Sequence, residues 1–459
     1  MKLLKDSAMA NSCGEMMADN VSSQKTLTFK AHRRRWGLCG LFCTLLVAGG
    51  GVFHPVEYDN TASRYYMVSS LVDFGTWNID RYHETTIDKS FYDGHYYSNK
   101  GVGTALLGVP VYWMVRHTSA GSSQPALSQM SRYWVRLITT TVPYALVAVI
   151  MFGLASRLGA SPSRSVAMAL AYGLGTPAWI HASLYSGHLI TGMCVFGAFA
   201  IITSSVRGKA SRGKEKIMFL CAGFLSGWAV LTDYPAVLLV GILVVYAFVS
   251  RWGKSAPWWF IVGGSPTIII LMMYNHLCFG NPLNLSYGCQ SLPQFSQDAM
   301  VGLYGVRWPN PVSLLKLLFS PSRGILLISP VLLLTASGLR GMWVRGLRRE
   351  SVTIGVATTI YLLFNAGYVQ WHGGWIFGPR YLTPVLVLAS FPIAFARFRT
   401  SLWLCLLLVS TFQVGAAVLG MPHTPPVVVN PVRELILPLM ADGYTAINAA
   451  MRLGLRGPA

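Results

Sequence analysis

One long uncharged stretch of the sequence runs from Ser165 to Val206 and reads SVAMALAYGLGTPAWIHASLYSGHLITGMCVFGAFAIITSSV. These 42 residues contain no Lys, Arg, Asp or Glu. As one helix they would be about 63 Å long at about 1.5 Å per residue, whereas the apolar core of a bilayer is about 30 Å thick. The stretch therefore predicts a hairpin of two membrane-spanning helices that turns within the polar segment 181–188.

The composition also places the chain in a membrane. Of its 459 residues, 53% are hydrophobic and 11% are charged, and the mean hydropathy is +0.47. A soluble domain carries about 25% charged residues, so the composition argues against a soluble globular enzyme and against a disordered protein. The eight cysteines are scattered, which argues against a disulfide scaffold. We therefore expect a multi-pass integral membrane protein.

The formal net charge of +20 has two interpretations. Nucleic-acid binding is one, but the basic residues form short runs between apolar segments, without a basic domain or a recognition motif. Lys and Arg in such runs are typical of cytoplasmic loops beside anionic lipid. We therefore expect membrane lipids, and no nucleic acid, among the partners.

Gaps between charged residues predict about eleven transmembrane helices, so the expected fold class is an all-α polytopic membrane protein. The first span, 36–53, follows the basic cluster Lys30 and Arg33–Arg35, which holds the N-terminus in the cytoplasm. The remaining spans are expected at 136–157, 217–250 (a second hairpin), 257–279, 324–339, 351–369, 381–396 and 402–420. We expect residues 1–35 to be a disordered basic tail, 36–420 the membrane-embedded domain, and 421–459 an extracytoplasmic C-terminal tail.

The apolar segment Val102–Val115 has only 14 residues, which is short for a span. If it does not cross, 22 basic and 5 acidic residues lie inside, against 14 and 11 outside. This distribution follows the positive-inside rule, so we expect a juxtamembrane helix against the outer leaflet, with a short span as the alternative. The first extracytoplasmic loop then covers residues 54–131, and a second large outer loop covers 281–323.

Acidic residues are rare in this chain, yet they cluster in the first outer loop. Seven of the 16 lie there, namely Glu57, Asp59, Asp73, Asp80, Glu84, Asp88 and Asp93. The same topology places four other polar segments on that face, at 181–188, 233–235, 281–323 and 370–380. Titratable groups that converge at one membrane surface indicate an active site.

Short motifs carry the candidate chemistry. Glu57-Tyr58-Asp59-Asn60 follows the first span, and a carboxylate there suits a general base or a metal ligand; a solvated helix cap is the alternative. Lys100 lies where lipid head groups begin, so a phosphate ligand or an interfacial anchor would fit. Arg380 follows a glycine-rich turn at a helix mouth and can bind a phosphate with two hydrogen bonds, or simply snorkel. Arg323 is a second, weaker example.

Two histidines and the absence of several sequence motifs indicate which cofactors to expect. His181 and His188 are a weak metal signal, so we expect them to line a cavity and assign no metal ligands, although a divalent metal stays open. The sequence has no Walker loop, dinucleotide fingerprint or nucleophile elbow, so no nucleotide cofactor is expected. It also lacks the intramembrane charges and related halves that are typical of a secondary transporter.

Several motifs, in their order and spacing, resemble one class of enzyme. They are the acidic residues after the first span, Arg64, Leu71–Trp77, Asp93–Gly101, Leu106–Trp113, Tyr172–Pro177, Leu318–Gly324 with Ser329-Pro330, and Gly373–Tyr381. Over residues 36–400 the chain resembles polytopic glycosyltransferases of the GT-C class. Within that class it resembles the bacterial, family 39-like branch that is similar to protein mannosyltransferases and lipid A aminoarabinose transferase.

The resemblance implies a function. The donor is a sugar on a polyprenyl phosphate, approached from the extracytoplasmic face, and a lipid, glycan or protein acceptor displaces the lipid phosphate with inversion. Asp59 or Glu57 is implied as the base, while Lys100 and Arg380 hold the donor phosphate, where negative charge grows in the transition state. Further substrate-binding positions are Arg64, Asn60, His95, Tyr97, Arg323 and His188. In a prokaryote the implied location is the inner membrane.

The chain departs from the family pattern at two points. A gapless match anchored on Gly75–Trp77 puts Asn60, not Asp59, on the catalytic acid, although a one-residue shift restores Asp59. Lys100 is followed by Gly-Val-Gly instead of a proline-containing turn, which predicts a looser loop. If the base is missing, the alternative function is a non-catalytic protein of the cell envelope that binds or transports lipid-linked glycans.

Overall fold

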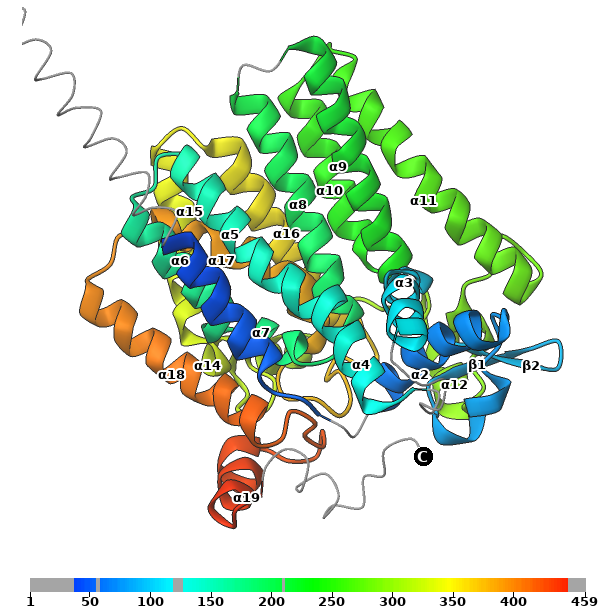
Figure 1. Cartoon of the computed structure of the whole chain (residues 1–459). Coiled ribbons are helices and arrows are strands. Elements are labelled where there is room, and N and C mark those ends of the chain that lie inside the picture. Colours follow the sequence, from blue (N-terminus) through cyan, green and yellow to red (C-terminus); the bar gives the residue numbers. More distant parts are fainter. Residues whose placement is uncertain (1–36, 55–57, 119–126, 209–210, 445–459) are drawn as a thin grey trace, which may run out of the picture.

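The computed structural model describes residues 37–54, 58–118, 127–208 and 211–444 (Figure 1). Nearly all regular structure in these residues is helical. The described strands form one antiparallel hairpin, β1 (Lys89–Tyr92) and β2 (His95–Ser98). The all-α polytopic fold class predicted from the sequence is therefore confirmed, with this small hairpin added to the first loop.

Five helices are long and apolar enough to cross a bilayer. They are Gln129–Arg157, which contains α4 (Gln129–Arg136), η3 (Leu137–Thr141) and α5 (Val142–Arg157), then α8 (Gly187–Arg207), α9 (Arg212–Thr232), α11 (Ala256–Phe279) and α18 (Thr400–Leu419). Shorter apolar helices lie at Gly37–Gly50, α10 (Ala236–Ser250), Pro330–Val344 and Arg380–Phe395. The multi-pass membrane protein predicted from the hydropathy is confirmed.

The uncharged stretch that opens the sequence argument is a helical hairpin. Its first arm, α6 (Pro162–Gly175), begins after Ser161, whose side chain accepts a hydrogen bond from the Arg164 backbone, with Pro162 in the first turn. The arm ends before Pro177, since a residue that precedes proline avoids the helical conformation. A short helix, α7 (Ala178–Ala182), fills the turn, and α8 returns. The predicted turn at 181–188 is therefore confirmed.

Small residues let neighbouring spans approach closely. A Cβ at Gly223 of α9 would lie 1.9 Å from the Phe260 carbonyl oxygen of α11, and one at Gly263 would lie 2.1 Å from the Leu220 oxygen. Glycines at such crossings allow backbone-to-backbone packing, which replaces the hydrophobic driving force that lipid does not supply. The pair α9 and α11 therefore forms a rigid support beside the first loop.

The first loop folds into compact structure at one end of the bundle, where Figure 1 shows α2, α3 and the hairpin together. It comprises α2 (Asp59–Ser69), η1 (Ser70–Phe74), η2 (Asp80–Thr85), the hairpin and α3 (Val102–Thr118). The far end of α3 is tied back to this loop, because Arg116 and Tyr112 donate to the Asp73 carboxylate at 3.1 and 2.7 Å. These bonds link the end of α3 to η1, and a juxtamembrane position of α3 stays a prediction from the charge distribution.

Two glycines dock the start of α3 against the end of α9. A Cβ at Gly101 would lie 2.5 Å from the Thr232 carbonyl oxygen, and one at Gly103 would lie 2.5 Å from the Thr232 hydroxyl oxygen. The Gly-Val-Gly sequence therefore permits a tight contact, and the looser loop predicted from the missing proline is wrong. The contact fixes Lys100 next to the residue that follows α9.

The remaining elements complete the loop end and the second half of the bundle. They are η4 (Ser286–Cys289), α12 (Pro293–Met300), α13 (Pro311–Phe319), α14 (Ile325–Ile328), η5 (Pro330–Leu333), α15 (Leu334–Val344), α16 (Arg348–Gly367), η6 (Arg380–Leu382), α17 (Thr383–Ser390), η7 (Phe391–Phe395), η8 (Val432–Ile436) and α19 (Leu437–Ala441). Within the C-terminal segment, residues 421–444 fold against the bundle, and the Pro422 backbone oxygen accepts a 2.7 Å hydrogen bond from the Phe377 backbone.

Replacing Gly101 with Ala is expected to lower the free energy of unfolding by about 1–3 kcal/mol, because the new Cβ would meet two backbone oxygens of α9. Thermal unfolding of the detergent-solubilised protein measures the change. Gly213→Ala is the matched control, since a Cβ there meets no atom within 4 Å. Equal transition temperatures for the two variants would show that the Gly101 contact does not hold the loop.

Candidate active site

Polar side chains line two adjoining hollows, of about 310 and 370 Å³, at the loop end of the bundle. The residues that line both are Asn60, Ile87, Asp88, His188, Phe295, Gly374, Trp375 and Arg380. We call these two hollows the ionic cavity. Its walls come from the first loop and from every polar segment that the sequence placed on the same face: 181–188, 233–235, 281–323 and 370–380.

The β hairpin brings an acid and a base together in this cavity. Its register places Lys89 opposite Ser98, so Asp88, which precedes β1, lies beside Asn99 and Lys100, which follow β2. The Lys100 Nζ lies 3.0 Å from an Asp88 carboxylate oxygen, and both residues are buried. The Asn99 amide donates to the other oxygen at 3.4 Å.

Burial and neighbouring charges shift the pKa of both partners. Burial alone raises the pKa of the Asp88 carboxyl, but Lys100 and Arg380, with the hydrogen bonds from Lys100 and Asn99, outweigh it and lower the pKa. Burial lowers the pKa of Lys100 to about 8; Asp88 opposes this shift, while Arg64 and Arg380 add to it. Asp88 is therefore a carboxylate at neutral pH, and Lys100 is a cation.

Two further cations lack a carboxylate partner. Among the described residues, no Asp or Glu oxygen lies within ion-pair distance of Arg64 or Arg380, and the Nε of each has no hydrogen-bond partner. Arg64 donates to the backbone oxygen of Asn60 at 2.6 Å and to its side-chain oxygen. Arg380 donates to the Tyr381 hydroxyl at 2.9 Å. Since buried charges are normally paired, these guanidinium groups are suited to an anionic ligand.

Glycines make room for both guanidinium groups. A Cβ at Gly187, the first residue of α8, would lie 3.1 Å from an Arg64 nitrogen. A Cβ at Gly373 would lie 2.9 Å from Arg380, and Gly373 has a φ of +75°, which favours glycine. The glycine-rich turn predicted to present Arg380 therefore does so by close packing.

A histidine and a carboxylate meet where two spans end. His188 is the second residue of α8, and Asp233 directly follows α9. The His188 Nδ1 lies 2.6 Å from an Asp233 oxygen, and both side chains are buried. His188 also contacts two rings edge-on, with centroids 6.1 Å from His181 and 5.6 Å from Tyr381.

The two carboxylates expected to act as the base, Glu57 and Asp59, are not both found beside the expected phosphate ligands. Glu57 lies outside the described residues. The Asp59 carboxylate accepts a 2.8 Å hydrogen bond from the Ile87 backbone and lines only one of the two hollows. Asn60 lines both hollows and accepts from Arg64. Asp59 is the first residue of α2, not its N-cap, and its carboxylate ties the start of this helix to the segment before β1.

Three expected ligands do not line the ionic cavity. His95 is exposed beyond the hairpin turn, where its Nδ1 lies 2.7 Å from Asp80. Tyr97 packs its ring 5.4 Å from that of Phe279, in an apolar cluster. Arg323 donates to the Gly374 backbone oxygen at 2.8 Å, so it supports the turn that presents Arg380. Lys100, Arg380, Arg64, Asn60 and His188 are the expected ligands that do line the cavity.

Sequence reasoning missed Asp88, Asp233 and Tyr381 as site residues. A signal for Asp88 was present: Asp93-Gly94 is a typical two-residue hairpin turn, and both residues have positive φ, at 49° and 80°. Counting outward from that turn pairs the residues next to Asp88 with those next to Lys100. Asp233 had no such signal, because its partner lies 45 residues away.

The described residues offer no ready metal site. No group of three or more His, Cys, Asp or Glu side chains among them is arranged to hold an ion. The carboxylates that line the cavity all have partners: Lys100 for Asp88, His188 for Asp233, the Gln370 amide for Asp298 and the Ile87 backbone for Asp59.

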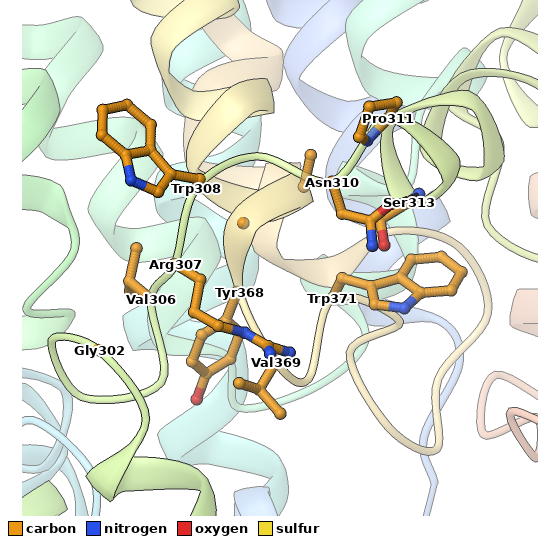
Figure 2. Close-up of a pocket in the computed structure, with 12 residues that line it drawn as sticks. Gly302, Val306, Arg307, Trp308, Asn310, Pro311, Ser313, Tyr368, Val369 and Trp371 are labelled. Atoms are coloured by element: carbon orange, nitrogen blue, oxygen red, sulfur yellow. Dashed lines mark hydrogen bonds between the residues drawn. The ribbon is translucent and has the colours of Figure 1, made fainter.

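A larger groove of about 900 Å³ adjoins the ionic cavity. Figure 2 shows Trp308 and Trp371 on opposite sides of it, with Arg307 and Asn310 between them. Trp308 is almost fully exposed (93%). Tyr368 lines both the groove and the cavity, and its ring centroid lies 5.1 Å from that of Tyr381. The groove carries no carboxylate, so the ionic cavity is the better candidate for chemistry.

No protein-family model and no curated protein sequence matches this chain. Two solved structures of ArnT from Cupriavidus metallidurans are similar. The apo state has a TM-score of 0.53 at 17% identity, covering 84% of this chain and 63% of that chain. The structure bound to undecaprenyl phosphate has a TM-score of 0.48 at 17% identity, covering 83% and 63%. The chain thus spans less than two thirds of this neighbour. The apo structure confirms the GT-C-like fold that the resemblance predicted.

Anion binding in the ionic cavity should weaken as the pH rises through about 8, where Lys100 loses its charge. Sulfate is the best probe, because its own charge is constant between about pH 6.5 and 9.5, and tryptophan fluorescence, with Trp375 in the wall, can report its binding. Above the pKa the affinity should fall by up to about tenfold per pH unit. Lys100→Arg, whose guanidinium stays charged, should remove the dependence, and a pH-independent affinity in the unaltered protein would contradict the assignment.

Proposed function

We propose that the chain is a membrane-embedded glycosyltransferase that moves a sugar from a polyprenyl-phosphate donor to a lipid, glycan or protein acceptor. The observation that carries the proposal is the ionic cavity, where Arg64 and Arg380 lie beside Lys100 and have no carboxylate partner in the part of the chain that the structure describes. The GT-C-like fold supports it. We place this cavity on the extracytoplasmic face with the N-terminus in the cytoplasm, as the distribution of basic residues favours.

A phosphate fits the cations of the cavity. Removing a charge from water costs several kcal/mol unless a counter-charge and hydrogen bonds replace the lost hydration. An Arg side chain offers two parallel donors that match phosphate oxygens, and the Lys100 ammonium adds a third charge nearby. As the sugar–phosphate bond breaks, negative charge grows on the phosphate, so fixed cations stabilise the transition state more than the ground state.

Apolar side chains beside the cavity suit the lipid part of such a donor. Met300 and Leu303, in the loop segment that also supplies Tyr304 to the cavity wall, are 80% and 73% exposed. Large apolar side chains that remain exposed next to a polar site mark a contact with another apolar surface. A polyprenyl chain that runs from the cavity into the bilayer would cover them.

The proposed reaction is a single displacement. The acceptor hydroxyl oxygen forms a bond to the sugar carbon that carries the phosphate, and the bond from that carbon to the phosphate oxygen breaks. The phosphate keeps the electron pair, the acceptor proton goes to a base, and the configuration at the carbon inverts. Asp59 and Glu57 remain the bases implied by the resemblance, although the hydrogen bond from Ile87 holds Asp59 in a structural role.

A second candidate function follows from Asn60. This amide lies where the resemblance places a catalytic acid, and an amide cannot accept a proton at neutral pH. A protein with the same cavity that binds or carries lipid-linked glycans without chemistry would also need Lys100 and Arg380. Only the glycosyltransferase forms a covalent product, so detecting one distinguishes it from a glycan-binding or transport protein.

The test uses proteoliposomes that contain the purified protein and undecaprenyl-phosphate sugars with a labelled monosaccharide, together with envelope lipids as acceptors. We expect labelled product and release of undecaprenyl phosphate. Lys100→Ala and Arg380→Ala should each lower kcat/KM by about 10²–10³-fold, as for loss of a fixed charge at a developing anion. Lys316→Ala is the control, because Lys316 is exposed on α13 and does not line the cavity.

Donor binding without product formation would favour the glycan-binding alternative. Transfer that survives both Lys100→Ala and Arg380→Ala undiminished would show that the phosphate lies elsewhere.

A further inference from the structure

Among the described residues of the first loop, three side chains with oxygen acceptors in the cavity wall already hold a hydrogen bond or an ion pair. Asp59 accepts from the Ile87 backbone, Asn60 accepts from Arg64, and Asp88 accepts from Lys100. Protonation of Asp88 would break its ion pair with Lys100, the Asn60 amide does not take up a proton at neutral pH, and the Ile87 hydrogen bond holds the Asp59 carboxylate in place. A base on another wall of the cavity would leave these contacts intact.

His188 has the features that a base requires. Its Nδ1 lies 2.6 Å from the Asp233 carboxylate, which can only accept, so the hydrogen on this bond belongs to Nδ1. The tautomer with a protonated Nδ1 leaves a lone pair on Nε2. That nitrogen has no hydrogen-bond partner among the described residues, although the side chain is 93% buried and lines both hollows of the ionic cavity.

The cavity also positions the pair rigidly. His188 lies in the first turn of α8 and Asp233 directly follows α9, so each sits on the end of a long span. The ring of Tyr381 contacts His188 edge-on, and the same tyrosine accepts a hydrogen bond from Arg380. His188 is thereby placed one side chain away from a cation that we assign to the donor phosphate.

We propose that His188 is the general base of the transfer reaction and that Asp233 is its positioning residue; this role rests on the proposed function above. The Nε2 lone pair takes the acceptor hydroxyl proton as the oxygen bonds to the sugar carbon. The carbon–phosphate oxygen bond breaks, and its electrons stay on the lipid phosphate. The resulting imidazolium is stabilised by the Asp233 carboxylate.

The neighbouring His181 is a weaker candidate for the same role. Its Nδ1 lies 2.8 Å from the Ser186 hydroxyl, which can donate or accept, so that contact does not fix the tautomer. His181 also lines only one of the two hollows, and no carboxylate lies within ion-pair distance of it among the described residues. The carboxylate partner therefore singles out His188.

The kinetic test compares His188→Ala with the unaltered protein in the proteoliposome assay. Loss of a general base should lower kcat by about 10²–10⁴-fold, while the affinity for undecaprenyl phosphate, measured separately, changes little. Added imidazole should restore part of the activity of His188→Ala. His117→Ala is the matched control, because His117 is exposed on α3, away from the cavity.

Asp233 is tested by a signature that does not depend on turnover. In ¹⁵N-histidine NMR spectra of the unaltered protein, His188 should show a protonated Nδ1 and an unprotonated Nε2. Asp233→Asn should disturb this pattern and lower kcat without weakening the binding of undecaprenyl phosphate. A purely structural Asp233 would leave the tautomer unchanged.

The outcomes test the assignment of His188 as the base separately from the proposed transferase function. If the unaltered protein transfers sugar and His188→Ala keeps its kcat, or the Nε2 carries the proton, the base assignment is overturned and the transferase stands. If the unaltered protein binds the lipid and forms no product, the proposed function is overturned, and the base role with it. Loss of kcat with retained binding and rescue by imidazole supports both.

Discussion

The buried ion pair between Asp88 and Lys100 is the interaction on which the candidate site depends. Each charge that leaves water loses hydration worth several kcal/mol, so such a pair persists only where the structure holds both groups and adds hydrogen bonds. Here the β1–β2 register and Asn99 provide that support. Arg64 and Arg380 have no carboxylate at ion-pair distance in the described chain, so their guanidinium groups can bind an anion even though Asp59, Asp88, Asp233 and Asp298 also line the cavity.

The site residues come both from loop segments and from the ends of membrane-spanning helices. The first loop supplies Arg64 and Lys100, η6 supplies Arg380, and the ends of α8 and α9 supply His188 and Asp233. The glycine contact between α3 and α9 joins the two halves, because it places Lys100 beside the end of the helix that precedes Asp233. A displacement reaction needs a stabilised leaving group and a base at a fixed separation, and this arrangement can provide both.

Much of the fold could be predicted from the sequence, because charge gaps in a membrane protein have few physical explanations. The stretch 165–206 could only be a hairpin, and Lys100 and Arg380 were recognisable from their settings. The Asp93-Gly94 turn could have predicted the pairing of Asp88 with Lys100, but only once the register of the two strands had been counted from that turn. The contact of His188 with Asp233 was not readable, since it depends on how two spans end side by side. His95 looked like a ligand because it shares a motif with Lys100, yet it directly follows the hairpin turn, where its side chain is exposed.

The most direct measurement is an electron cryomicroscopy map of the full chain with undecaprenyl phosphate. The account predicts phosphate density within hydrogen-bond distance of the Lys100 ammonium and the Arg380 guanidinium, with the prenyl chain running past Met300 and Leu303. Phosphate density in the groove beside Trp308, with the Asp88–Lys100 pair undisturbed and the ionic cavity filled only by water, would contradict it.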